Sequence, residues 1–240
     1  MNLIFDIGNT GTKLAIFDGQ KKIVSFRKKL FHWERMQKMC APYTDKLDRA
    51  IISCVRDTPE FVLDLATHGI PYVHVLSHQS KLPFRNTYET PESLGPDRLA
   101  AVAGAYRHFK GEKVLIIDTG SAVTYDLLSG NTYKGGNISP GLSMRFKALH
   151  KFTGKLPLAS TTIKYSPLGK NTLEAITAGV INGLIYEINE NIRVFQKKYP
   201  DIIVILTGGD SGYLKERIGS KVKYIPDIVF DGLNYILECN

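Results

Sequence analysis

Short apolar runs that end in polar turns alternate along the chain with longer segments whose apolar residues recur every three or four positions. The short runs, which predict strands, are residues 3–5, 12–17, 23–26, 50–55, 71–76, 113–118, 122–128, 201–206 and 222–225. The longer segments, which predict helices, are residues 33–40, a segment after Asp57–Glu60, 98–109, 171–199, a short one after Asp210, and 227–237. Strands that alternate with helices are typical of an α/β fold.

The two halves of the chain repeat one local pattern. In each half an apolar strand ends in aspartate, a polar turn follows, and a second strand runs into a glycine turn, at Asp18-Gly19 and at Ser129-Gly130. The matched residues are Asp6, Gly8 and Thr12 in the first half and Asp118, Gly120 and Thr124 in the second, 112 positions apart. This repeat predicts a duplicated domain, with residues 1–112 as the N-terminal copy and residues 113–240 as the C-terminal copy.

Each strand-end turn is a candidate phosphate site. Glycine leaves backbone N–H groups open to a ligand, and phosphate oxygens bind such amides. An aspartate beside phosphate requires a cation between the two anions, and Mg²⁺ typically binds one or two carboxylates together with substrate phosphates. A D-x-G sequence after a strand is also compatible with a simple turn. Two copies in matched context, with Thr207–Asp210 after another strand, favour a nucleotide cleft between two similar domains.

A second candidate site lies in Gly95–Arg98, directly before an alanine-rich helix. Asp97 could serve only as the N-cap of that helix. An acid and a guanidinium at the start of a helix can also accept a hydroxyl proton and hold an anionic substrate group. The residues alone leave both interpretations of Asp97 open.

Composition narrows the class of protein. With 43% hydrophobic and 22% charged residues, the chain is expected to be neither disordered nor fibrous. The net charge of +8 suggests an anionic partner, but residues 1–112 carry 16 basic and 12 acidic groups and residues 113–240 carry 15 and 11. The excess is therefore spread over both halves, and nucleic acid is not expected as the main ligand.

The location of the protein is also predicted from sequence. Neither a signal-peptide core nor an apolar stretch long enough to span a membrane is visible. The three cysteines, Cys40, Cys54 and Cys239, form no CxxC pair. Scattered cysteines of this kind fit reduced thiols, so we expect a cytoplasmic protein with no membrane partner.

Five short motifs follow one another along nearly the whole chain. They are D-x-G-N-T at Asp6–Thr10, Gly-x-Asp-Arg at Gly95–Arg98, D-x-G-[ST]-A-x-T at Asp118–Thr124, Gly-Gly-x-Ile-x-Pro-Gly at Gly135–Gly141 and Thr-Gly-Gly-Asp at Thr207–Asp210. Together, and in this order, they closely resemble the type III pantothenate kinase family. The resemblance implies two duplicated ribonuclease-H-like, actin-like ATPase domains with mixed sheets flanked by helices, as in the superfamily of acetate and sugar kinases, heat-shock proteins and actin.

The same resemblance implies the activity and its partners. The expected reaction is the ATP-dependent phosphorylation of pantothenate to 4'-phosphopantothenate, the first step of coenzyme A biosynthesis. The expected cofactors are ATP, Mg²⁺ and a monovalent cation, K⁺ or NH₄⁺. A homodimer is expected to complete the substrate site at its interface.

The resemblance also implies roles for single residues. Asp97 resembles the general base, and Asp118 matches the ligand of the monovalent cation. The residues that match ATP-binding positions are Asp6, which is also expected near Mg²⁺, Gly8, Asn9, Thr10, Thr12, Lys13 and Ser121. The residues that resemble pantothenate-binding positions are Tyr88, Gly95, Pro96, Arg98 and Thr172.

Two positions depart from the family pattern. Ser121 keeps the hydroxyl of the usual threonine but lacks its methyl group, and Pro96 replaces an alanine, which removes an N–H before Asp97. Two alternative functions stay open: an accessory factor in gene regulation without kinase activity, and another small-molecule kinase or nucleotide hydrolase on the same scaffold. Gly95–Arg98 favours pantothenate kinase, because this segment matches the family on the substrate side.

Overall fold

The computed structural model of the chain describes residues 1–28, 33–56, 65 and 69–240. These residues form two compact units. The first unit comprises Met1–Gly111, Leu128–Gly135 and Asp227–Asn240, and the second comprises Glu112–Leu127 and Gly136–Pro226. The expected division into duplicated domains, residues 1–112 and 113–240, stays a prediction. The first compact unit also contains Leu128–Gly135 and Asp227–Asn240, which belong to the second half of the sequence.

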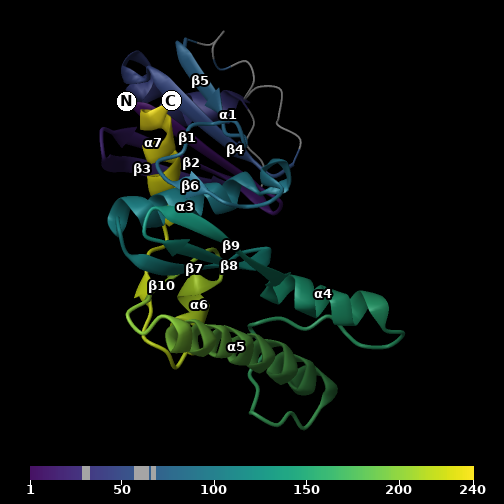
Figure 1. Cartoon of the computed structure of the whole chain (residues 1–240). Helices are drawn as coiled ribbons and strands as arrows, with labels where there is room; N and C mark the ends of the chain where they lie inside the picture. The colour runs from purple at the N-terminus through teal and green to yellow at the C-terminus, as the bar shows by residue number, and fades with distance from the viewer. Residues whose placement is uncertain (29–32, 57–64, 66–68) are drawn as a thin grey trace. The chain divides into compact units, whose positions relative to one another are not determined.

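A mixed sheet forms the centre of the first unit, with the strand order β3-β2-β1-β4-β5 among the described residues (Figure 1). Its strands are β1 (Asn2–Gly8), β2 (Gly11–Asp18), β3 (Lys21–Lys28), β4 (Arg49–Cys54) and β5 (Tyr72–Val75). The first three strands pair antiparallel, and β4 and β5 run parallel to β1. Strand β1 is therefore central, and its carboxyl end lies beside that of β4.

The glycine turns lie one residue later than the sequence predicted. Strand β2 extends through Asp18, so the loop to β3 is Gly19-Gln20, and the equivalent loop between β8 (Ala122–Ser129) and β9 (Thr132–Pro140) is Gly130-Asn131. Both glycines have positive φ, 54° and 58°. A positive φ at the first loop residue alone is the pattern of a type II′ hairpin turn, which matches the twist of the strands.

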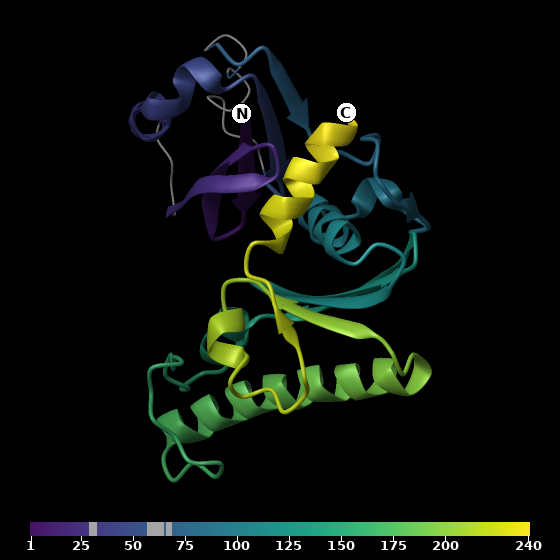
Figure 2. The same cartoon turned by 90° about the vertical axis from the view of Figure 1, so that its left-hand side faces the viewer.

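Helices cover both faces of the first sheet. They are α1 (Trp33–Cys40), η1 (Ala41–Lys46), η3 (Pro91–Ser93), α3 (Pro96–His108) and α7 (Ile228–Cys239). Helices α3 and α7 lie side by side (Figure 2) because two glycines allow a close approach. A Cβ on Gly232 would lie 1.8 Å from the carbonyl oxygen of Ala100, and one on Gly104 would lie 2.1 Å from that of Ile228.

The second sheet repeats the order of the first. Around β7 (Lys113–Thr119) the order is β11-β10-β7-β8-β9, with β10 (Ile203–Thr207) and β11 (Lys223–Tyr224), and the two-residue β6 (Arg85–Asn86) follows β9. Strands β10 and β11 run parallel to β7, as β4 and β5 do to β1. The matching order of two mixed sheets flanked by helices confirms the predicted fold class.

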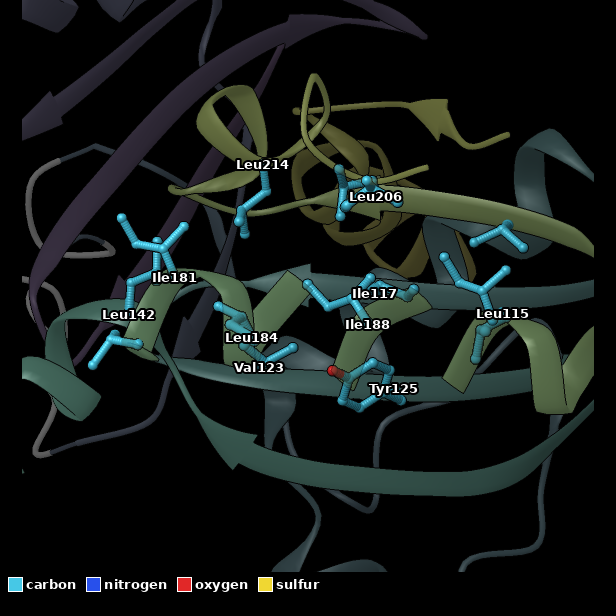
Figure 3. Close-up of a cluster of buried hydrophobic side chains, with 14 of the residues drawn as sticks. Leu115, Ile117, Val123, Tyr125, Leu142, Ile181, Leu184, Ile188, Leu206 and Leu214 are labelled. Atoms are coloured by element: carbon cyan, nitrogen blue, oxygen red, sulfur yellow. The ribbon is translucent and has the colours of Figure 1, made fainter. Parts of the chain in front are cut away.

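The core of the second unit lies between its sheet and helix α5 (Thr172–Lys198), with side chains of α4 (Leu142–Phe152) and α6 (Ser211–Leu214) at its edges (Figure 3). The buried residues of α5 that form the core stripe are Ile176, Val180, Ile181, Leu184, Ile188 and Ile192. Leu173, which the sequence pattern also placed on this stripe, is 39% exposed because it lies in the first turn of the helix.

A partly buried polar network lies at the edge of this core. The Tyr125 hydroxyl donates to Oε1 of Glu187 at 2.7 Å, the Ser139 hydroxyl donates to the same oxygen, and Arg145 pairs with Oε2. Burial raises the pKa of Tyr125, as does its bond to Glu187. Burial by itself would also raise the pKa of Glu187, but the hydrogen bonds from Ser139, Arg145 and Tyr125 outweigh it and hold the pKa below its ordinary value.

Several predicted elements are confirmed, and others were missed. Strand β2, helix α3 and helix α5 form within two residues of the predicted bounds, whereas β1 ends at Gly8, three residues past its predicted end. Helix α4, strands β6 and β9 and the short helices η1 and η3 were not predicted. The helix expected after Asp57–Glu60 lies outside the described residues. No helix among residues the structure describes is long and apolar enough to cross a membrane.

Candidate active site

The first strand-end motif forms a tight hairpin. Gly8 of β1 faces Gly11 of β2, so Asn9 and Thr10 make the loop, and both are exposed. Phe5 and Ile7 belong to the apolar core cluster of the first unit. Since successive side chains of a strand point to opposite faces, Asp6 lies on the other face of the sheet. The hairpin thus combines an exposed loop with a carboxylate outside the apolar core.

Asp6 forms an ion pair with Lys13, its register partner on β2. The ammonium Nζ lies 2.9 Å from Oδ2 of Asp6. Asp6 is buried, whereas a third of the Lys13 side chain is exposed. A buried carboxylate requires a compensating charge, and Lys13 supplies one. The pair brings a group that can bind a cation and a group that can bind phosphate to the same hairpin.

The donor set at Asp6 fits a Mg²⁺ ion that is held largely by a nucleotide. Within the described part of the chain, no three side chains of His, Cys, Asp or Glu come together as a metal cage. In phosphoryl-transfer enzymes Mg²⁺ usually needs only one or two carboxylates, because substrate phosphates and water supply the other ligands. One carboxylate at the end of β1 meets this requirement.

Two buried hydroxyl groups beside the strand-end aspartates were not predicted. Asp6 is the register partner of Ser53 on β4, and Asp118 is the register partner of Thr207 on β10. Ser53 is 0% and Thr207 is 1% exposed, and neither side-chain oxygen makes a hydrogen bond with a described residue. Register partners in a sheet present their side chains on the same face, so each hydroxyl lies next to its aspartate. Only the register of β4 and β10 brings these two hydroxyl groups next to Asp6 and Asp118.

Asp118 of the second unit is enclosed by glycines. A Cβ on Gly208 would lie 2.4 Å from Oδ1 of Asp118, and one on Gly120 would lie 3.3 Å from it. Gly208 has a φ of 98°, which favours glycine. The N–H of Asp210 donates to the carbonyl oxygen of Thr119 at 2.9 Å. The Thr207–Asp210 turn therefore packs directly against the end of β7.

Ser121 lies in the turn between β7 and β8, and the start of α4 closes over this turn. The N–H of Gly141 donates to the carbonyl oxygen of Ser121 at 3.1 Å. A Cβ on Gly141 would lie 2.3 Å from the carbonyl oxygen of Gly120, so only glycine fits this position. The last glycine of the Gly135–Gly141 motif thus holds the backbone around Ser121.

Asp97 lies in the first turn of α3 and is not the N-cap. The N-cap is Gly95 and the first helical residue is Pro96, so the N-cap interpretation was wrong. Proline loses nothing there, because the first N–H of a helix has no helical partner. Oδ1 of Asp97 accepts the N–H of Arg98 at 2.9 Å, and a Cβ on Gly95 would lie 2.5 Å from that oxygen. Glycine before proline therefore makes room for the Asp97 carboxylate.

Arg98 and Tyr88 lie together in the first unit. Arg98 is only 5% exposed, and its guanidinium carbon lies 5.6 Å from the centre of the Tyr88 ring. Thr172 is the exposed first residue of α5, after the N-cap Asn171, and belongs to the second unit with Asp118 and Ser121. Each unit thus holds part of the predicted site.

A cavity of about 240 Å³ in the first unit lies away from these residues. Its wall is largely apolar and includes Leu3, Met36, Cys40 and Ile70. Burial raises the pKa of the Cys40 thiol to about 11, so the thiol is not a reactive thiolate at neutral pH. The cavity carries no part of the candidate site.

Comparison with known proteins decides the family. The family model described as type III pantothenate kinase matches residues 2–194. Type III pantothenate kinases of Bacteroides fragilis (strain YCH46) and Christiangramia forsetii (strain KT0803) are 42% and 38% identical to the chain. Both alignments cover 100% of this chain, and they cover 98% and 99% of the relatives. The chain belongs to the type III pantothenate kinase family.

Solved structures agree with the fold of this type III pantothenate kinase family member. A Campylobacter jejuni protein described as a Baf family transcriptional activator has a TM-score of 0.65 and 21% identity, over 99% of this chain and 98% of that one. A Sinorhizobium meliloti protein described as a 2-dehydro-3-deoxygalactonokinase has a TM-score of 0.59 and 13% identity, over 100% and 97%. At these identities the likeness shows the fold alone.

The match to the type III pantothenate kinase model spans every predicted site residue, since these lie between Asp6 and Thr172. Thr207–Asp210 lies beyond that match but within the full-length alignments to the kinases of the two species. The individual roles of these residues stay predictions.

Proposed function

We propose that the chain transfers the γ-phosphoryl group of ATP to the primary hydroxyl of pantothenate, giving 4'-phosphopantothenate in the first step of coenzyme A biosynthesis. Full-length identity of 42% with a type III pantothenate kinase carries the proposal. The arrangement of Asp97 and Arg98 at the start of α3 is consistent with it, since an acid and a guanidinium there suit a hydroxyl substrate with an anionic group.

Asp97 is proposed as the general base. Its carboxylate has a defined orientation, because Oδ1 accepts the Arg98 amide and Gly95 leaves room for it. Phosphoryl transfer depends mainly on alignment and on electrostatic stabilisation, so Asp97 orients the attacking hydroxyl and accepts its proton as the oxygen bonds to phosphorus. Arg98 binds the pantothenate carboxylate, and Tyr88, Gly95, Pro96 and Thr172 complete the proposed binding positions.

The hairpin of β1 and β2 is proposed to bind the ATP phosphates. The exposed loop residues Asn9 and Thr10, with Gly8 and Thr12, offer backbone amides and hydroxyls, and the Lys13 ammonium can bind a phosphate oxygen. Asp6 would hold Mg²⁺, which neutralises phosphate charge when bound. Ser121 is proposed as a further ATP contact from the second unit.

Asp118 is proposed to hold the monovalent cation, K⁺ or NH₄⁺. The carboxylate oxygen lies where Gly120 and Gly208 leave space, and the buried Thr207 hydroxyl lies on the same face of the sheet. These are hard oxygen donors, which suit an alkali cation. The composition of the site therefore fits the proposed ligand.

A homodimer and a cytoplasmic location complete the proposal. Large exposed apolar side chains occur on β9, on α4, on α5 and between these helices: Ile138, Met144, Phe152, Leu158, Leu168, Leu173, Tyr186 and Val194. Exposed apolar surface of this kind often marks an interface, and sedimentation would measure the assembly directly. All three cysteines are free, which fits a reducing compartment.

A coupled assay of ADP formation tests the proposed activity. The purified chain is given Mg·ATP and pantothenate in K⁺, NH₄⁺ or Na⁺ buffers, with a reaction lacking pantothenate as control. We expect pantothenate-dependent turnover that is faster in K⁺ or NH₄⁺. The absence of such turnover in every buffer would contradict the proposal, and salt-dependent DNA binding in its place would favour an accessory factor in gene regulation.

A further inference from the structure

Two stacked aromatic rings and a guanidinium group lie in a row in the first unit. The ring of Tyr88 lies against the ring of Tyr133, with centres 6.2 Å apart and planes inclined by 7°. The Arg98 guanidinium carbon lies 5.6 Å from the centre of Tyr88. Tyr88 thus contacts a second aromatic ring as well as the arginine that we propose as the pantothenate contact.

Tyr133 is the fixed member of this stack. Its side chain is 0% exposed, and Phe84 meets its ring edge-on at 6.4 Å and 73°. Its backbone is held as well, because both the N–H and the hydroxyl of Thr87 donate to the carbonyl oxygen of Tyr133, at 3.3 Å and 2.7 Å. A ring held on all these sides can fix the plane of a less buried neighbour.

Gly135 completes the wall behind Tyr88. Tyr133 and Gly135 are two residues apart on β9, so they face the same side of the strand. Gly135 has a φ of 99°, and a Cβ there would lie 3.7 Å from Cδ2 of Tyr88. The backbone N–H of Tyr88 donates to the side-chain oxygen of Asn86, which is the register partner of Tyr133. Strand β9 therefore packs against the ring of Tyr88, and Asn86 of β6 holds its backbone N–H.

We infer that Tyr133 is a positioning residue of the pantothenate site and acts through Tyr88 on Arg98. A guanidinium binds a carboxylate with two parallel hydrogen bonds only when its plane is correctly oriented. The face of an aromatic ring attracts a guanidinium, so the orientation of Tyr88 also sets the orientation of Arg98. The inference rests on the proposed function, because it assigns the stack to the substrate of that reaction. It also gives the first glycine of the Gly135–Gly141 motif a role.

Steady-state kinetics of Tyr133→Leu and Tyr133→Phe test the inference. Because cation–π orientation acts on binding, we expect the KM for pantothenate to rise roughly tenfold in Tyr133→Leu, with kcat and the KM for ATP within about threefold. Tyr133→Phe keeps the ring and should stay within about twofold of the wild type in all three constants. If Tyr133→Leu does not fold, Tyr133→Ile serves instead, since a β-branched residue suits a strand.

Two comparisons separate positioning from general damage. Phe17→Leu removes a fully buried aromatic ring of β2, so it should lower stability but leave the KM for pantothenate unchanged. In a Tyr88→Leu background, Tyr133→Leu should add no further rise, because the intermediate ring is already absent. A KM for pantothenate in Tyr133→Leu equal to that of Phe17→Leu would overturn the inference alone. If the wild type shows no pantothenate turnover, both the inference about Tyr133 and the proposed function are wrong.

Discussion

Lys13 and Asp6 face each other across the first hairpin, with the lysine ammonium 2.9 Å from a carboxylate oxygen that is almost fully buried. The pair links the stability of the sheet to the proposed ATP site. Lysine compensates the buried charge in the folded chain, and the same ammonium is available to phosphate at the end of the hairpin.

Replacement of Lys13 by methionine should affect both properties. We expect a loss of about 1–3 kcal/mol in the free energy of unfolding, because a buried carboxylate loses its partner. We also expect the KM for ATP to rise roughly tenfold, because a charged contact to phosphate is lost. Urea unfolding and ATP titrations measure the two effects. Lys13→Arg keeps the charge and should recover most of the stability, and a Lys13→Met protein with wild-type stability and ATP affinity would refute both assignments.

The two glycines with positive φ at Gly208 and Gly19 should respond differently to alanine. In Gly208→Ala the new Cβ meets Oδ1 of Asp118 and the backbone of Thr119 at 2.4 and 2.5 Å, so we expect a loss of about 3 kcal/mol. In Gly19→Ala no atom lies within 4 Å, so only the backbone penalty of about 1–2 kcal/mol remains. Urea unfolding of the pair measures both losses. Equal losses of stability in the two variants would show that the close packing of Gly208 against Asp118 and Thr119 does not contribute to the free energy of unfolding.

The network around Glu187 should make stability depend on acid pH. The folded-state pKa of Glu187 lies below its ordinary value of 4.5, so its contribution is present above about pH 4.5 and is lost as the pH falls through the folded pKa. Glu187→Gln should cost about 2 kcal/mol at pH 7, since hydrogen bonds to a charged group are lost. Unfolding curves from pH 7 down to pH 3 should show the difference between wild type and variant shrinking below pH 4.5. A difference independent of pH would exclude an ionised Glu187 as the cause.

The fold was predictable where the residues of a periodic apolar pattern are also the residues that pack in a core. The strand that ends at Asp6, its repeat at Asp118 and the long helix α5 each carry a periodic apolar pattern, and these same residues form the cores of the two units. Helix α4 carries Leu142, Phe146 and Leu149 at helical spacing, and all three pack on the core, but this helix was not predicted from the sequence. Its start is set by contact between Gly141 and the Ser121 turn.

The candidate site was predictable where its functional residues follow one another in the sequence. Gly95–Arg98 is such a segment, and its residues do lie together at the start of α3. The hydroxyls of Ser53 and Thr207 and the ring of Tyr133 were missed because strand register, and not sequence distance, brings them to their partners. The N-cap interpretation of Asp97 failed because Gly95 and Pro96 start the helix two residues earlier.

Product formation by the wild type and by Asp97→Asn, followed by mass spectrometry of the phosphorylated pantothenate, tests both the proposed reaction and its proposed base. Asparagine keeps an oxygen that can accept the Arg98 amide but cannot accept the substrate proton, so the site should keep its shape. We expect 4'-phosphopantothenate from the wild type, a decrease of roughly 10²- to 10⁴-fold in kcat for the variant, and unchanged ATP binding. No phosphorylated pantothenate from the wild type, or turnover by Asp97→Asn at the wild-type rate, would contradict this expectation.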